Sequence, residues 1–176
     1  MPTHDLAALP ANSRVFVDTN IFDLHFKNKS ISCTAFINRL AQGELIGYVN
    51  IQVLSDLMHK LMLVEAYIKE YIKKISANEL RGWLKANRHL ANTLTQYQEQ
   101  FEYILSIIER KNLHIGRKLM VKTKEERATY GLMTGDSLHL GTMRRNTIKL
   151  TDIVTHDEDF TDIHGLEVWR PMDVIP

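Results

Sequence analysis

The 176-residue sequence has a single cysteine and no long apolar run. Cys33 can form no internal disulfide and has no second thiol for a zinc site, which indicates a reducing compartment. The longest apolar runs, such as residues 61–64, are far shorter than the roughly 20 residues that cross a bilayer, so no membrane contact is expected. Residues 1–12 lack the cationic start and apolar core of a signal peptide, and we expect the protein in the cytoplasm.

An excess of either charge is also missing, because 22 Lys and Arg nearly balance 21 Asp and Glu. This balance argues against nucleic-acid binding by bulk charge alone. The charges are nevertheless segregated, since residues 110–124 hold six basic residues and no acid, whereas residues 150–176 hold seven acids and only Arg170 as a base. The basic run fits a solvated surface and a phosphate-contacting patch equally well. A phosphate-contacting patch requires the basic run, together with Arg144 and Arg145, to lie on the same face of the protein as the acids.

Short apolar runs alternate with segments of helical periodicity, and 44% hydrophobic residues are enough for a globular core. Strands are predicted at residues 14–17, 45–49, 152–155 and 166–169. Helices are predicted at residues 32–42, 53–75 (unbroken or broken once), 80–90, 94–108, 123–132 and from Asp136 onward. The helix at 123–132 is expected to begin with a capping box of Thr123 and Glu126.

This alternation predicts an α/β fold, a three-layer sandwich with a central, mainly parallel sheet that helices cover on both faces. We expect residues 1–176 to form a single domain, with a helical insertion at about 65–111.

Aspartates stand at the ends of two predicted strands and at the start of a helix. Asp18 ends the first strand, Asp157 follows the strand at 152–155 with Asp159 two residues on, and Asp136 begins a helix. Each alone is an ordinary helix cap or turn residue. In open α/β sheets, however, ligands bind at the carboxyl ends of the strands, and carboxylates that converge there repel each other unless a cation neutralises them.

Oxygen donors without a matching set of Cys or His favour Mg²⁺ or Mn²⁺ over zinc. Such an ion lowers the pKa of a bound water and stabilises charge on an attacked phosphate and on its leaving oxygen. The acids therefore point to metal-assisted phosphoryl chemistry.

Four motifs in order along the chain resemble those of PIN-domain nucleases, and VapC-type toxins most of all. The motifs are VFVDTN at 15–20, VLSDL at 53–57, GDSLHL at 135–140 and IVTHDEDF at 153–160. Residues 165–171 also resemble the last strand of that family. The resemblance implies a PIN-like fold and a Mg²⁺- or Mn²⁺-dependent endoribonuclease that hydrolyses phosphodiester bonds of single-stranded RNA, as the toxin of a toxin–antitoxin pair.

Carried over by position, the resemblance assigns roles to individual residues. The implied metal-binding acids are Asp18, Asp136, Asp157 and Asp159. The implied catalytic acids are Asp18, Asp56, Asp136 and Asp157. Asp56 stands where the family usually has Glu, and it fits either a role through a bridging water or a solvated helix face. Asn20 and Thr155 are implied to orient the acids and water, whereas His139, between two leucines, is expected to be packed and hydrogen-bonded.

The resemblance also implies partners, namely single-stranded or structured RNA, an antitoxin protein that covers the acidic site, and a second copy of the chain in a homodimer. The alternative is a non-catalytic PIN-like module that binds RNA or a protein through a degraded site. Haloacid-dehalogenase phosphatases need a second aspartate where this chain has Asn20. Receiver domains need an early acidic pair and a late lysine, which the sequence also lacks.

Overall fold

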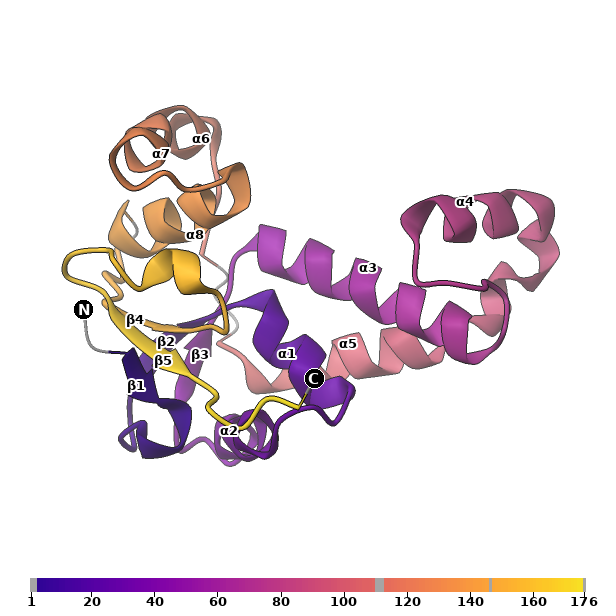
Figure 1. Cartoon of the computed structure of the whole chain (residues 1–176), viewed down its shortest axis with the longest axis horizontal. Coiled ribbons are helices and arrows are strands. Elements are labelled where there is room, and N and C mark those ends of the chain that lie inside the picture. The colour runs from indigo at the N-terminus through magenta and orange to yellow at the C-terminus, as the bar shows by residue number, and fades with distance from the viewer. Residues whose placement is uncertain (1–2, 110–112, 146, 176) are drawn as a thin grey trace.

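Five strands form one sheet at the centre of the computed structural model, which describes residues 3–109, 113–145 and 147–175 (Figure 1). The strands are β1 (Thr3–Asp5), β2 (Arg14–Val17), β3 (Ile46–Tyr48), β4 (Asp152–Val154) and β5 (Glu167–Arg170). Their order across the sheet is β1-β5-β4-β2-β3, and all four pairings are parallel. The prediction of a central parallel sheet is confirmed. Four of the strands were predicted, and β1 was not.

Helices cover both faces of this sheet, which confirms the three-layer α/β sandwich (Figure 1). The α-helices are α1 (Thr19–Phe26), α2 (Ile31–Ala41), α3 (Ile51–Ile68), α4 (Ala77–Ala86), α5 (Gln96–Ile107), α6 (Arg117–Lys122), α7 (Lys124–Tyr130) and α8 (Thr134–Arg145). Three short 3-10 helices are η1 (Leu6–Ala8), η2 (Arg88–Thr93) and η3 (Glu158–Phe160). No described helix combines the length and the apolar character that a membrane crossing requires.

The structure corrects the predicted start of two helices. Thr123 has helical backbone angles (φ −68°, ψ −5°) and forms no side-chain cap, because α6 leads directly into α7. Its hydroxyl instead donates to the carbonyl of Met120, and Glu126 pairs with Arg145 at 2.7 Å, so the predicted capping box is wrong. Asp136 does not begin a helix but lies in the first turn of α8, which starts at Thr134.

The main core lies between the sheet and the helices that pack on it. The strand residues Val15, Phe16, Val17, Ile153 and Val154 are fully buried. Because β2 and β4 are parallel neighbours with Val17 beside Val154, the residues that follow them emerge together at one edge of the sheet.

A helical arm made of α3, α4, η2 and α5 projects from the sandwich (Figure 1). It has a second, smaller core of Leu63, Ala66, Ile72, Leu80 and Leu94. The periodic segment at 53–75 is broken once, since α3 ends at Ile68 and Glu70 turns the chain with φ of 59°. The arm corresponds to the predicted helical insertion, although α3 begins well before residue 65 and Lys111 lies outside the described residues.

Candidate functional site

Asp18 is held in one orientation at the carboxyl end of β2. It is only 8% exposed, and its own N–H donates to the carbonyl of Val154. One carboxylate oxygen accepts the N–H of Thr19 at 2.6 Å, and the other accepts from Asn20 Nδ2 at 2.6 Å and from Thr155 Oγ1 at 2.7 Å. These three donors hold both oxygens of the carboxylate in place.

Asn20 and Thr155, which were predicted as supporting residues, join the ends of β2 and β4. Asn20 Oδ1 accepts the N–H of His156 at 3.0 Å, while its Nδ2 also donates to Thr155 Oγ1 at 3.2 Å. Thr155 Oγ1 in turn accepts the N–H of Asp157 at 3.0 Å. The two side chains therefore fix Asp18 and the backbone before Asp157 relative to each other.

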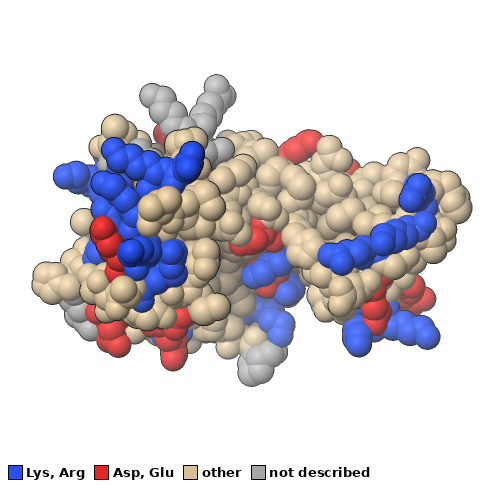
Figure 2. Space-filling model, turned by 90° about the horizontal axis from the view of Figure 1, so that it is seen from above, with Lys and Arg blue, Asp and Glu red and all other residues tan. Residues whose placement is uncertain are grey.

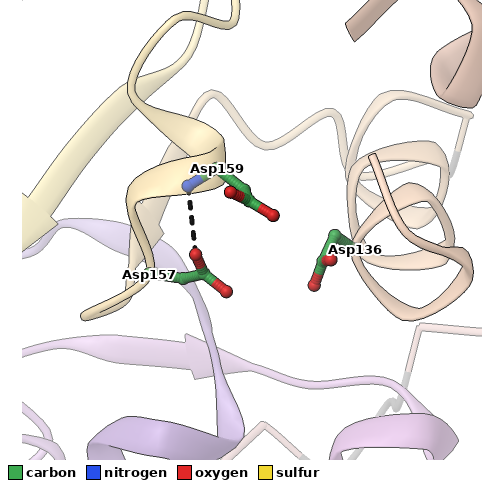
Figure 3. A group of neighbouring side chains, drawn as sticks. All are labelled: Asp136, Asp157 and Asp159. Carbon is green, nitrogen blue, oxygen red and sulfur yellow. Dashed lines mark hydrogen bonds between the residues drawn. The ribbon is translucent and has the colours of Figure 1, made fainter. Parts of the chain in front are cut away.

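Asp136, Asp157 and Asp159 form a compact group of carboxylates. One oxygen of each lies within 4.8 Å of one oxygen of the other two. Figure 3 shows that Asp157 and Asp159, at the start of η3, point toward Asp136 from α8, and that the N–H of Asp159 donates to Asp157. Ligand oxygens of one Mg²⁺ lie about 2.1 Å from the ion and thus at most about 4.2 Å apart, so this spacing fits a hard divalent cation after a small adjustment.

The electrostatics of Asp136 also fit a cation. Burial raises the pKa of Asp136 to about 6, and the negative charges of Asp157, Asp18 and Asp159 add to the effect. The negative charge of Asp136 is therefore unfavourable beside the other three carboxylates. A divalent ion would remove that repulsion, so the donor set and its charge both suit Mg²⁺ or Mn²⁺.

A pocket of about 290 Å³ extends from these acids to α3. Its lining residues are Asp18, Thr19, Asn20, Asp56, His59, Lys60, Gly135, Asp136, His139 and Asp157. Asp56 therefore faces the same pocket as the other acids, but it lies outside the three-carboxylate group and accepts a hydrogen bond from Gln52 at 2.9 Å.

His139 is buried and hydrogen-bonded, as predicted, yet it also lines the acidic pocket. Asn50 Oδ1 accepts the N–H of Val53, so Asn50 Nδ2 faces His139 Nδ1 at 3.1 Å and donates to it. Burial lowers the pKa of His139 against the opposing influence of Asp18 and Asp56, which favours the neutral ring.

Three further residues lie near the site and were not predicted from the sequence, namely Asn50, His59 and Lys60. Asn50 carried little signal, because asparagine before a helix is an ordinary N-cap and Asn50 does cap α3. His59 and Lys60 could have been found, since they stand three and four residues after Asp56 and so share its side of a helix.

The basic run forms a different hollow, of about 630 Å³. Arg117, Lys118, Lys122 and Arg145 line it, and none of its lining residues belongs to the acidic pocket. Figure 2 shows basic side chains gathered over the α6–α8 side of the molecule. Arg110 and Lys111, which were part of the predicted run, lie outside the described residues.

The fold is that of a PIN-like α/β sandwich, with its acids at the carboxyl ends of central parallel strands. No protein-family profile and no curated protein matches the chain. A similar solved structure is that of VapBC2 from Rickettsia felis bound to a DNA fragment from its promoter, with 15% sequence identity and a TM-score of 0.56. The match covers 89% of this chain and 98% of that one, and at this identity it shows a shared fold.

Proposed function

We propose that the protein is a Mg²⁺- or Mn²⁺-dependent endoribonuclease that hydrolyses phosphodiester bonds of single-stranded RNA. The carrying observation is the group of Asp136, Asp157 and Asp159 beside the fixed carboxylate of Asp18. Four acids at one edge of a parallel sheet need a cation, and a hard cation in an open pocket suits phosphate substrates.

In the proposed site, Asp136, Asp157 and Asp159 hold the ion together with Asp18. When bound, the ion supplies a more acidic water and neutralises charge on the phosphate and its leaving oxygen. Asn20 and Thr155 hold Asp18 in place through the hydrogen bonds at 2.6 and 2.7 Å.

Asp56 reaches the pocket from α3, outside the three-carboxylate group, and we assign it a role through a bridging water. Its side chain is one methylene shorter than the glutamate expected there. Lys60, one turn later, places a cation at the pocket wall where the phosphate of a substrate would lie.

We further propose that the protein is the toxin of a toxin–antitoxin pair, with an antitoxin segment that covers the acidic pocket and a second copy of the chain as dimer partner. The PIN-like fold and the likeness to VapBC2 support this assignment. An antitoxin that offers a basic side chain to the acids would satisfy the charge that the cation otherwise neutralises.

A non-catalytic PIN-like module remains the second candidate, and one observation favours it. Asp56 is shorter than the expected glutamate, and its carboxylate already accepts a hydrogen bond from Gln52. In that case the acids serve as caps and turn residues, and the pocket binds RNA or a protein without cleaving it.

Cleavage of a mixed single-stranded RNA pool tests the proposal. We expect the wild type to cut with Mg²⁺ or Mn²⁺ and not with EDTA, and Asp18→Asn and Asp136→Asn to lose at least about a hundredfold in rate. Asp162→Asn, an exposed aspartate outside the group, is the matched control and should cut normally. A folded wild type that binds RNA but never cuts it would establish the non-catalytic module.

A further inference from the structure

One side of α4 and the start of η2 carries a row of cations. Arg81 and Lys85 stand four residues apart on α4 and so share one side of that helix, and Arg88, at the start of η2, lines the same cleft as both. All three are exposed, and within the described residues none of them has an ion-pair partner. Figure 2 shows a row of basic side chains along the arm, at the end of the molecule away from the α6–α8 side.

These cations border a cleft of about 430 Å³ between α3 and α4. The other lining residues are His59, Met62, Ala77, Leu80 and Leu84. In the described part of the chain no acid is among its lining residues, and three of them are cationic. The rest of its lining is mainly aliphatic, and among the described lining residues only His59 has a ring on which a base could stack.

One side of α3 leads from the acidic pocket into this cleft. Asp56, His59 and Met62 recur at a spacing of three residues, so each is a neighbour of the next on the helix surface. Asp56 lines the acidic pocket, Met62 lines the cleft, and His59 lines both. Six residues of helix span about 9 Å, so the two sites are continuous.

We infer that this arm cleft binds the sugar–phosphate backbone of the RNA strand that enters the acidic pocket, with Arg81, Lys85 and Arg88 as phosphate contacts. The inference rests on the proposed ribonuclease function. The cleft adjoins the acidic pocket, where the proposed function places phosphodiester hydrolysis. This favours RNA over an acidic peptide as the polyanion that binds in the cleft. Contacts from Lys and Arg to phosphates position the RNA strand without recognising its bases, so we expect the cleft to have little sequence preference.

The direct test is RNA binding by the full chain in EDTA, where no cleavage occurs. Arg81→Gln/Lys85→Gln is compared with Lys29→Gln/Lys149→Gln, which removes the same charge elsewhere. Lys29 follows the end of α1 that is distant from Asp18, and Lys149 precedes β4 and so lies toward the opposite edge of the sheet. Fluorescence anisotropy of a labelled single-stranded RNA gives the affinity over a range of salt concentrations.

The arm variant should bind about tenfold more weakly near physiological salt, and its salt dependence should fall by about 1.4 in log–log slope for two lost phosphate contacts. The control should match the wild type. Equal affinities for both double variants, or wild type that binds an acidic peptide but no RNA, would overturn the inference. If the arm variant binds RNA more weakly but the wild type never cleaves RNA, the cleft is supported and the nuclease function is rejected. If the wild type cleaves RNA and the arm variant binds it as tightly as the wild type does, only the cleft is rejected.

Discussion

Asp136 is the residue whose protonation the acidic pocket changes most. Its pKa is raised from 3.8 to about 6, so the folded protein holds this proton over a pH range in which the unfolded chain has lost it. As pH rises through that window, the group therefore costs stability. In metal-free protein, Asp136→Asn should raise the free energy of unfolding at pH 7 by about 1 kcal/mol, a value reduced for partial solvent screening.

Thermal unfolding in EDTA at several pH values measures this effect. The difference between Asp136→Asn and the wild type should shrink toward zero as pH falls below about 4, because both unfolded and folded wild type are then protonated. Asp162→Asn should follow the wild type at every pH. Equal melting temperatures for Asp136→Asn and wild type at pH 7 would contradict the proposed repulsion.

Metal binding at the same carboxylates gives the opposite response. Mg²⁺ or Mn²⁺ at about one hundred times its dissociation constant should stabilise the wild type by about 2.7 kcal/mol, since only the folded chain assembles the site. The gain should be smaller at pH 5, where the proton on Asp136 competes with the ion. The stabilisation by the ion should also be largely lost in Asp136→Asn. Calorimetry with and without EDTA measures this stabilisation in both proteins. An equal gain in both proteins would place the ion elsewhere.

The order of the acids could be predicted from sequence, but their distances could not. Asp18 and Asp157 each follow an apolar strand, and the strand pattern predicts that both lie at the same edge of a parallel sheet. It does not predict that β2 and β4 are neighbours, and that pairing brings the two ends together. The close approach of Asp136 depends on how α8 packs against the sheet. No local pattern encodes that packing, and it also decides that His139 faces the acidic pocket.

At the scale of elements, strands were predictable where burial is strong. β2 and β4 are runs of buried β-branched and aromatic residues, whereas β1 contains Thr3, His4 and Asp5 and pairs only at the edge with β5. The first turn of α2 shows a further limit of local patterns. Asp173, far along the chain, accepts the N–H groups of Ile31 and Ser32 at 2.7 and 2.9 Å, an interaction that no local spacing reveals.

The arm depends on a buried carboxylate that joins two of its helices. Glu65 of α3 is only 3% exposed, and its oxygens accept the N–H groups of Thr95 and Tyr97 at 3.0 and 2.8 Å while pairing with Lys69 at 2.7 Å. Burial opposes the charge, but these hydrogen bonds outweigh it and lower the pKa of Glu65. The carboxylate is therefore a stabilising contact at neutral pH and loses that role as pH falls below about 4.

Glu65→Ala should consequently destabilise the protein by about 2 kcal/mol at pH 7, because the N–H groups of Thr95 and Tyr97, in partly buried hydrogen bonds, lose their acceptor. The rate of amide hydrogen exchange should increase most at the start of α5, whereas the strands of the sheet should exchange as slowly as in the wild type. Glu70→Gln, an exposed acid in the turn after α3, serves as control and should change neither quantity. Unchanged exchange at Thr95 and Tyr97 would show that α5 is positioned without Glu65.

At the scale of the whole molecule, net charge conceals the organisation of charge. The chain is nearly neutral, yet Lys and Arg gather over the arm and over the α6–α8 side (Figure 2). The acids proposed to bind metal meet at one edge of the sheet. Composition alone would have argued against an RNA-binding protein. The fold gathers four acids after the strands and in the first turn of α8, and it leaves basic residues of α4 and α6 along two other hollows, where a polyanion could bind.

The arm also exposes apolar side chains that suit the proposed homodimer. Tyr67, Ile68 and Leu105, on the neighbouring helices α3 and α5, are 47%, 65% and 38% exposed. Exposed apolar groups on adjacent helices are typical of protein interfaces.

We expect light scattering to give twice the 20.4 kDa mass of one chain, and Ile68→Lys to shift it toward the single-chain mass. Met133→Lys places the same charge at a 72% exposed position before α8 and should remain dimeric. A dimer that both variants retain would move the interface away from the arm, and a monomeric wild type would reject the homodimer itself.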